Sequence, residues 1–477
     1  MKITEIAIFD HKQFKNFVVD LTYPKGHPKA GKSLDKVCFI GPNGTGKTTI
    51  LEILKYGLDK ESEFRKYEDK SLIGLSFQIK LTKHLQLGIT VVDRKVNILR
   101  KHTSLLWINE EIGEQIINNY YKDRVNTKND YLENSKFQRP SFEVSDQHII
   151  DFEILFRKNL TISSPSESFV NNALKIKDDF DVSLYEAFEH FNDSTLFFSE
   201  VSNEKIKDFW KILTYQVKKR EDDYQKFLKQ EHNRSKTVAE VEANFDKENP
   251  KILDKIAKLW NQILEKAGLE FDAEGASNPI QLTDNLKAYI RLKSNKQPIP
   301  YNELSTGIRN FIFKVGHIYS LYFNRNIESG FLMIDEPENS LFPDFLYDIV
   351  GIYQEITQNT QIFMATHSPI IAAQFEPCER IILDFDDEGY VTARKGIVPT
   401  GDDPNDILVK DFGIRSLLGK EGVEKWERFI ELKLLIKSET NIAQKAEYIN
   451  EYMEIGKAYS FGYDIKLKQD EANYQKS

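Results

Sequence analysis

A glycine-rich loop carries the clearest chemistry in this chain of 477 residues. The stretch GPNGTGKTT follows the apolar run KVCFI and matches the pattern G-x-x-x-x-G-K-[ST] in full. In such a loop backbone N–H groups surround phosphates, the lysine reaches the β and γ oxygens, and the following hydroxyl binds Mg²⁺. The predicted nucleotide ligands are Gly41, Pro42, Asn43, Gly44, Thr45, Gly46, Lys47, Thr48 and Thr49. Lys47 is also predicted to be catalytic and Thr48 to be a metal ligand, so the loop indicates a site for ATP and magnesium.

Two carboxylates and a histidine follow apolar strands further along the chain. Asp335 and Glu336 end the run FLMIDE, and His367 ends TQIFMATH. Asp335 is predicted to hold Mg²⁺, and Glu336 to orient or deprotonate the attacking water. Because ligands bind at the carboxyl ends of strands in α/β sheets, His367 is predicted to contact the γ-phosphate. Two acidic residues at the end of a strand are weak evidence for catalysis by themselves. They are strong evidence when they follow a phosphate loop in the same chain.

A second stretch suited to an anion is ELSTGIRNF, residues 303–311. Ser305 is a good N-cap, and Ile308, Phe311 and Ile312 recur at helical spacing after it. Small residues at Ser305, Thr306 and Gly307 leave backbone N–H groups facing outward at the positive end of a helix. The chain thus has two candidate phosphate sites, which raises the question of why one protein needs both.

Hydrophobic periodicity places these residues on strands and helices. The predicted strands are 36–40, two or more antiparallel strands within 71–100, 286–293, 330–337 and 360–368. The predicted helices are 48–58, two or more within 201–268 that break near Pro250, 303–323, 343–356, and much of 404–455. Residues 126–147 are predicted to be a surface loop, and residues 384–389 a strand and turn. Strands that alternate with helices indicate an α/β fold with a mainly parallel sheet.

Bulk properties exclude several classes of protein. The formal net charge of −9 gives no general attraction to nucleic acid. The basic run at Lys218, Lys219 and Arg220 is followed at once by acidic residues, so a solvated helix face is favoured over a nucleic-acid site. Two cysteines, Cys38 and Cys378, fit a reducing compartment. No apolar run is long enough to span a membrane, and we expect a soluble cytoplasmic protein.

The motifs GPNGTGKTT, LSTG, MIDEPENSLFP and ATHS, in this order, resemble ATP-binding-cassette (ABC) ATPases of the SMC and RecF type. The resemblance implies an ABC-ATPase head with a mixed or parallel sheet, an antiparallel β subdomain and a helical insertion. The predicted domains are an N-terminal ATPase lobe at 1–100, a mainly helical insertion at 101–283, a C-terminal ATPase lobe at 284–400 and a helical extension at 401–477.

The same resemblance implies an answer to the question of the second phosphate site. In that family the LSGG-like signature of one head binds the γ-phosphate of ATP held by a second copy, so Ser305, Thr306 and Gly307 would serve the partner chain. Two heads would close around two nucleotides as a homodimer or higher oligomer. Asn339, Ser340 and Leu341 correspond to the D-loop near the dimer interface. This chain has Thr306 where glycine is common and Ile308 where Glu or Gln is frequent, and its Gln loop is left open between Gln78, Gln138 and Gln147.

The compact head and the stretches DEPENSLFP and DPNDILVKDFGIRS also resemble stand-alone ATPases of bacterial antiphage systems, such as the PtuA ATPases of Septu and retron systems. OLD nucleases have a similar head followed by a Toprim domain, but no Toprim set follows His367 here. A sensor or regulator of a separate nuclease or toxin, with nucleic acid as a possible trigger, is therefore the favoured function. A DNA-repair or maintenance ATPase is the alternative, and the nucleotide-binding subunit of a transporter is a third reading that the long charged insertion disfavours.

Overall fold

The computed structural model describes two compact units, Met1–Pro404 and Asn405–Ser477. The residues described are 1–58, 76–87, 90–101, 104–109, 159–166, 198–201, 206–272, 290–299, 303–323, 327–357, 359–414 and 416–461. The predicted loop at 126–147, two of the three candidate glutamines and the C-terminal end lie outside these ranges. The second unit begins close to the domain boundary predicted at residue 401.

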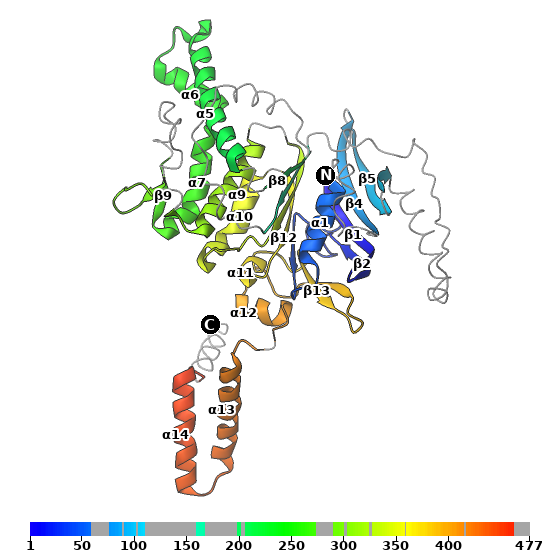
Figure 1. The fold of residues 1–477 in the computed structure, drawn as a ribbon, viewed down its shortest axis with the longest axis vertical. Helices are drawn as coiled ribbons and strands as arrows, with labels where there is room; N and C mark the ends of the chain where they lie inside the picture. Colours follow the sequence, from blue (N-terminus) through cyan, green and yellow to red (C-terminus); the bar gives the residue numbers. More distant parts are fainter. Residues whose placement is uncertain are drawn as a thin grey trace, which may run out of the picture. The chain divides into compact units, whose positions relative to one another are not determined.

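A seven-stranded sheet forms the centre of the first unit, in the order β14-β13-β3-β12-β11-β7-β8 (Figure 1). Its strands are β3 (Lys36–Ile40), β7 (Asn159–Ser164), β8 (Phe198–Glu200), β11 (Ser329–Asp335), β12 (Thr360–Ala365), β13 (Arg380–Phe385) and β14 (Val391–Lys395). Every neighbouring pair is parallel except β13 with β14. The predicted α/β fold with a mainly parallel sheet is confirmed. Parallel strands bring the chain segments that follow β3, β12, β11 and β7 to one edge of the sheet.

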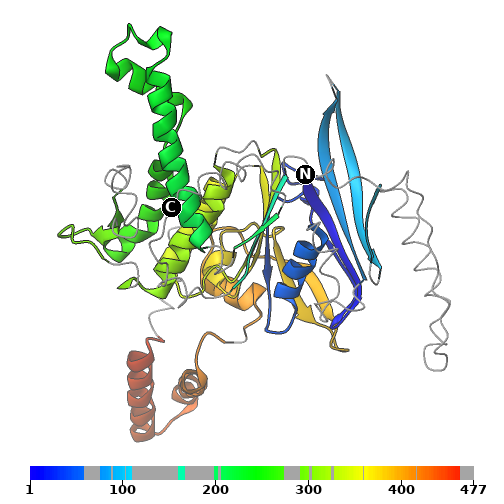
Figure 2. The ribbon, with the colours of Figure 1, turned by 45° about the horizontal axis from the view of Figure 1, so that its top comes forward.

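A five-stranded antiparallel sheet lies beside the central sheet, in the order β2-β1-β4-β5-β6. Its strands are β1 (Lys2–His11), β2 (Phe14–Asp20), β4 (Ser76–Leu87), β5 (Thr90–Lys101) and β6 (Ser104–Asn109). Helix α1 (Lys47–Leu58) runs between the two sheets (Figures 1 and 2). Its Ile50 and Leu54 share one core with Ile6 of β1 and Phe363 of β12. Burial on both sides of α1 therefore joins the predicted antiparallel subdomain to the parallel sheet.

Helices cover the other face of the central sheet. Helices α9 (Thr306–Tyr322) and α10 (Leu346–Ile356) lie next to it, and α5 (Ile206–Leu228) and α7 (Ile252–Leu264) pack on these helices. Helix α6 (Val238–Glu248) packs on α5. The short elements near these helices are η5 (Glu231–Asn233), η6 (Glu265–Ala267), β9 (Leu269–Phe271), β10 (Ile290–Leu292) and η9 (Pro343–Phe345), and α11 (Pro369–Ala372) follows β12. The apolar side chains of α7 are buried, and the Trp260 indole N–H donates to the Ile312 carbonyl at 3.1 Å. This hydrogen bond fixes α7, which precedes the signature in the chain, to α9.

The predicted insertion at 101–283 is too wide, because β6, β7 and β8 lie within that range. Strand β7 was missed because its sequence, NLTISS, is polar although the strand is buried in the central sheet. Two of its polar side chains have partners inside the fold, since the Asn159 amide donates to the Ser329 hydroxyl at 3.0 Å and the Thr161 hydroxyl to the Asn159 side chain at 3.3 Å. Buried polar groups with partners obscure the apolar pattern from which a strand is predicted.

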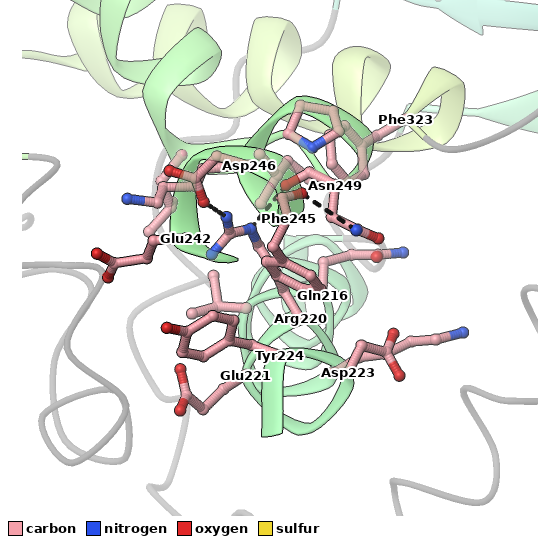
Figure 3. A pocket seen from close by; sticks show the side chains of 16 residues that line it. Gln216, Arg220, Glu221, Asp223, Tyr224, Glu242, Phe245, Asp246, Asn249 and Phe323 are labelled. Atoms are coloured by element: carbon pink, nitrogen blue, oxygen red, sulfur yellow. Dashed lines mark hydrogen bonds and ion pairs between the residues drawn. The ribbon is translucent and has the colours of Figure 1, made fainter. Parts of the chain in front are cut away.

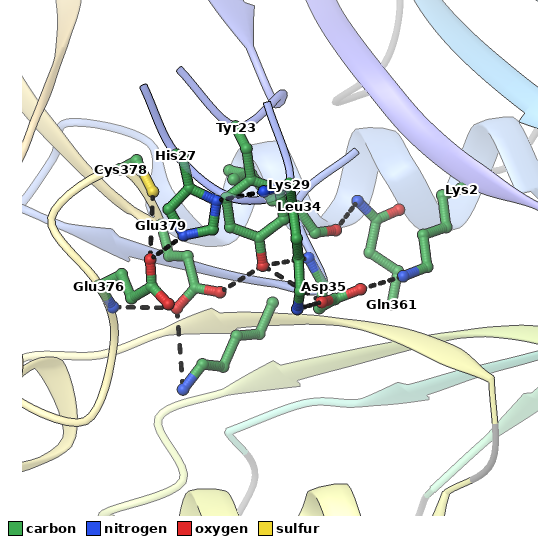
Figure 4. Close-up of polar contacts among 11 residues, drawn as sticks. Lys2, Tyr23, His27, Lys29, Leu34, Asp35, Gln361, Glu376, Cys378 and Glu379 are labelled. Atoms are coloured by element: carbon green, nitrogen blue, oxygen red, sulfur yellow. Dashed lines mark hydrogen bonds and ion pairs between the residues drawn. The ribbon is translucent and has the colours of Figure 1, made fainter. Parts of the chain in front are cut away.

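A polar network ties the antiparallel sheet to the amino ends of the central strands (Figure 4). The Gln361 amide donates to the carbonyls of Ile3 and Leu34 and accepts from the Ile3 N–H at 2.7 Å. The Tyr23 hydroxyl contacts the carboxylates of Asp35 and Glu379 at 3.2 and 3.1 Å. This network lies at the amino ends of β3 and β12, the ends opposite the phosphate loop, and fixes the two sheets to each other.

The second unit contains a helical hairpin of α13 (Lys420–Ser438) and α14 (Ile442–Tyr459). It is preceded by α12 (Pro404–Asp406), which spans the boundary between the units, and by the π-helical turn η10 (Ile407–Asp411). Phe429 stacks on Tyr452 with ring centroids 4.1 Å apart, and Arg428 forms two hydrogen bonds with Glu451 at 2.8 Å. None of the described helices has the length and apolarity of a membrane span.

Candidate functional site

The phosphate loop connects the carboxyl end of β3 to the first turn of α1, as the sequence predicts. Gly41, Gly44 and Gly46 have positive φ angles of 145°, 83° and 83°. A Cβ atom at Gly46 would lie 2.4 Å from the Phe14 ring, so both the backbone conformation and the space require glycine there. Lys47 is 7% exposed, and its ammonium donates to the carbonyls of Gly41 and Pro42 at 2.9 and 3.0 Å. The loop is therefore a closed turn with its lysine folded over it.

Thr48 and Asp335 meet across the edge of the sheet, although they are far apart in the sequence. The Thr48 hydroxyl donates to Asp335 Oδ2 at 3.0 Å. Burial raises the pKa of Asp335 to about 6, and the nearby Glu336 and Glu338 add to this effect, while the Thr48 hydrogen bond opposes it. A buried carboxylate beside a hydroxyl and other acids is a donor set that suits Mg²⁺, which takes oxygen ligands. Among the described residues no group of three or more His, Cys, Asp or Glu side chains forms a complete metal cage, so phosphates and water would complete the coordination.

Glu336 and His367 lie at the carboxyl ends of adjacent strands, β11 and β12. The Glu336 N–H donates to the Ala365 carbonyl at 2.9 Å, and Glu336 has a φ of 46°, in the left-handed region. A residue other than glycine in that region stores strain, which is common at active sites. Burial lowers the pKa of His367, and the charge of Lys47 lowers it further, while Glu338 and Glu336 oppose both effects. The fold thus brings Lys47, Thr48, Asp335, Glu336 and His367 to one edge.

Three further residues at this edge were not predicted from the sequence. Both oxygens of Glu338 accept hydrogen bonds from the residues after β12, at 2.8 and 2.7 Å. Lys314 of α9 is 5% exposed and donates to the Pro165 carbonyl at 3.1 Å, and burial lowers its pKa to about 8. The Gln13 amide donates to the Gly44 carbonyl at 2.8 Å. Glu338 could have been noticed as a third acid after the apolar strand, whereas nothing in the sequence pattern singles out Gln13 or Lys314.

The predicted signature begins α9, and Ser305 caps it by accepting from the Ile308 N–H at 3.4 Å. Ser305 is exposed, Thr306 is half-buried and Gly307 is buried. Helix α9 lies on the face of the central sheet opposite α1 in both views (Figures 1 and 2). The predicted phosphate loop and the predicted signature thus precede helices on opposite faces of the central sheet. The fold brings the signature to the predicted D-loop, since a Cβ at Gly307 would lie 1.9 Å from the Ser340 carbonyl oxygen.

Gly307→Ala is expected to lower the free energy of unfolding by about 1–3 kcal/mol and to displace the turn at Ser340, because the added methyl meets backbone atoms. Gly351→Ala is the matched control. Gly351 lies exposed in α10 with nothing within 4 Å of an added Cβ, so this variant should be neutral or stabilised by about 0.5–1 kcal/mol. Denaturant unfolding measures both changes. Equal effects of the two substitutions would contradict the tight packing of the signature on the D-loop.

The described residues around the end of β7, the neighbour of the strand that carries Asp335, include no glutamine. Strand β7 pairs with β11 and is followed by Pro165 and Ser166, and residues 159–166 contain no glutamine. Gln78 lies on β4 opposite Ala7, in the antiparallel sheet rather than at this edge. The turn after β7 is held by Lys314 and by the Asn339 amide, which donates to the Ser166 carbonyl at 2.9 Å. The position of the Gln loop therefore stays open, since Gln138 and Gln147 lie outside the described residues.

A cavity of about 220 Å³ lies away from this edge, between α5, α6 and α7 (Figure 3). Arg220 projects into it and pairs with Asp246, while its Nε donates to the Asn249 carbonyl at 2.9 Å. The guanidinium also lies over the Phe245 ring. Arg220 thus already pairs with a carboxylate and a carbonyl of its own chain. We therefore interpret the cavity as a gap in the packing of three helices rather than as an anion-binding site.

In metal-free protein, Asp335→Asn is expected to stabilise the fold above pH about 6. Because the pKa of Asp335 is raised, the folded state binds more protons than the unfolded state between pH about 4 and 6, and its stability falls as pH rises through that window. The neutral amide does not titrate, so the advantage of the variant should grow from pH about 4 to 7. Melting temperatures of both proteins with a chelator measure this. A constant difference across that range would contradict the unfavourable burial of the Asp335 charge.

The fold and this edge together define a P-loop ATPase: a phosphate loop, a strand-end acidic pair and a strand-end histidine on neighbouring parallel strands. The chain belongs to the family described as the AAA ATPase domain, which matches residues 1–372. No curated protein matches the chain. The predicted ATPase class is confirmed by the family match.

Solved structures of SMC heads are also similar to this chain. A SMC head bound to the C-winged helix domain of ScpA is 10% identical, with 84% of this chain and 98% of that one covered and a TM-score of 0.40. The SMC head domain from Thermotoga maritima is 10% identical, with 83% and 100% covered and a TM-score of 0.37. At these TM-scores the similarity adds nothing to the family match.

Proposed function

We propose that this ATPase requires magnesium, pairs with a second copy around ATP, and regulates a separate effector protein. In each site the loop Gly41–Thr49 would hold the phosphates and Thr48 with Asp335 would hold Mg²⁺. The metal would neutralise charge on the β and γ oxygens, and Glu336 would orient or deprotonate the attacking water. His367 would contact the γ-phosphate through a ring N–H.

The position of Ser305 is the observation that carries this proposal. The signature is an exposed, small-residue start of α9, and α9 lies on the face of the central sheet opposite α1, the helix that follows the phosphate loop. A helix start of this kind attracts a phosphate. We infer that this phosphate belongs to a nucleotide held by another copy of the chain, so that each ATP would lie between two heads.

The hairpin of the second unit supports the proposal of a separate effector. Its own core contains four buried apolar residues, Phe429, Leu432, Ile455 and Phe461. Leu434 of α13 and Met453 of α14 remain 63% and 64% exposed, and Trp426 and Ile430 are also exposed. Phe429 thus packs inside the hairpin, whereas the nearby Trp426 and Ile430 are exposed. Exposed apolar side chains beyond the needs of a small core mark an interaction surface.

We place the effector, a nuclease or toxin, in bacterial antiphage defence and the complex in the cytoplasm, following the motif resemblance. The formal net charge of −9 favours this role over direct action on DNA. A nuclease or toxin gene next to the gene of this chain would support the proposal.

Leu434→Glu with Met453→Glu in the full chain is expected to abolish association with the effector when the neighbouring genes are co-expressed, while ATP hydrolysis stays within about twofold of wild type, because surface substitutions have small effects on a folded core. Val238→Glu is the matched control, since Val238 is 68% exposed at the start of α6 in the first unit. Affinity purification and mass spectrometry measure the association. Retention of the same partner by both variants would remove the hairpin surface from the proposal.

A further inference from the structure

Glu338 joins the turn after β11 to the residues after β12. Its Oε2 accepts from the Thr366 hydroxyl at 2.8 Å, and its Oε1 accepts from the His367 backbone N–H at 2.7 Å. Hydrogen bonds to an ionised carboxylate are shorter and stronger than neutral ones. Both carboxylate oxygens are used, so this contact fixes the main chain at His367 as well as the side chain before it.

The turn that carries Glu338 is itself held at several points. The Glu336 N–H bonds to the Ala365 carbonyl, the Asn339 N–H returns to the Glu336 carbonyl at 3.1 Å, and the Leu341 N–H returns to the Glu338 carbonyl at 3.0 Å. The Asn339 side chain also bonds to Ser166. A turn with this many internal and external hydrogen bonds is a rigid support, and the Glu338 side chain extends from it to the next strand.

The residues on either side of His367 are fixed, but its own side chain is exposed. Thr366 and Ser368 are 0% and 7% exposed. The Thr366 hydroxyl also accepts from the Ser368 N–H at 3.0 Å, and the Ser368 hydroxyl caps α11 by accepting from the Ile371 N–H. His367 is thus an exposed imidazole on a short backbone segment whose direction depends on Glu338.

We propose that Glu338 is a positioning residue for ATP hydrolysis, which holds the His367 backbone so that the imidazole points at the γ-phosphate. This inference rests on the proposed function, in which ATP lies on the loop Gly41–Thr49 beside His367. Glu336 remains the residue that acts on water, because both oxygens of Glu338 already accept hydrogen bonds within the fold. The same carboxylate couples the turn that touches the signature helix to the strand that carries the histidine.

Glu338→Ala should lower kcat about 10- to 100-fold, the range that corresponds to the loss of hydrogen bonds to a charged group. KM should change by less than about threefold, because the phosphate loop is untouched. Glu338→Gln, which keeps the size and one acceptor oxygen, should fall between wild type and Glu338→Ala. Glu248→Ala is the matched control, since Glu248 is exposed at the end of α6.

The decisive experiment is a double-mutant cycle between Glu338→Ala and His367→Ala, with steady-state ATP hydrolysis as the readout. If Glu338 acts through His367, the double variant should be no slower than His367→Ala alone. A double variant slower by the full factor of Glu338→Ala would overturn the proposal, and so would a wild-type kcat in Glu338→Ala. Should Glu338→Ala fail to fold, the same cycle is run with Glu338→Gln and judged by the same criterion.

Failure of this inference can be told apart from failure of the proposed function. If wild type hydrolyses ATP and Glu336→Gln does not, the proposed function stands, and the cycle tests Glu338 alone. If wild type shows no hydrolysis with ATP and Mg²⁺, both the proposed function and the positioning role are overturned.

Discussion

Glu336→Gln is expected to bind ATP with nearly the affinity of wild type and to hydrolyse it about 10²–10⁴-fold more slowly, the usual effect of losing a general base. The substitution keeps the size of the side chain. It also leaves intact the proposed metal ligands Thr48 and Asp335, whose hydroxyl and Oδ2 atoms are 3.0 Å apart. The backbone of Glu336 is fixed in a left-handed conformation by its bond to Ala365. Because binding is retained and turnover is not, the ATP-bound closed dimer should accumulate.

Single-turnover hydrolysis and equilibrium ATP binding measure the two halves of this expectation. Asp335→Asn provides the contrast, because it should weaken Mg²⁺-dependent ATP binding itself. Size measurements of Glu336→Gln with ATP, compared with ADP, should show the dimer only with ATP. Near-wild-type turnover in Glu336→Gln would remove this residue from the mechanism and leave the acid that acts on water unassigned.

The parts of the site that could be predicted are those with fixed spacing along the chain. The loop at Gly41–Thr49, the acids at the end of β11 and His367 each follow an apolar strand, and parallel strands bring their ends together by geometry alone. The helix start at Ser305 was also predictable, because a capping side chain precedes a helical apolar repeat. These local signals need no knowledge of the rest of the fold.

The parts that could not be predicted depend on contacts between distant segments. Glu338 looks like a solvated acid until its oxygens are seen to accept from Thr366 and His367. Lys314 lies on the buried side of α9, where its ammonium donates to the Pro165 carbonyl, a contact that the sequence does not reveal. Strand β7 could not be predicted for the same reason, because its polar Asn159 and Thr161 side chains find partners inside the fold. A prediction made from the spacing of apolar residues cannot detect such hydrogen bonds between distant segments.

The proposed composite site predicts that two inactive chains complement each other. A chain with Lys47→Ala lacks the ammonium that folds over its own phosphate loop. A chain with Ser305→Arg places bulk and charge at an exposed helix start that would approach the γ-phosphate in the other chain. Each homodimer should be inactive, because both of its sites carry the defect. In a heterodimer of the two chains, one site combines both defects and the other is intact.

The heterodimer, isolated with two different affinity tags, should hydrolyse ATP at up to roughly half the wild-type rate, since one of two equivalent sites is whole. Coupling between the sites would lower that rate, so ATP-driven closure of the heads is measured on the same sample. Ser305→Ala is the matched control, because it removes the cap without adding bulk or charge and should cost about 1 kcal/mol of stability.

ATP hydrolysis by this heterodimer shows whether Ser305 acts on the nucleotide held by the other copy. Recovery of activity from two inactive chains is the result predicted if Ser305 serves the ATP held by the other copy. If the heterodimer forms but neither hydrolyses ATP nor closes, Ser305 acts within its own chain or on no nucleotide at all, and the composite site is wrong.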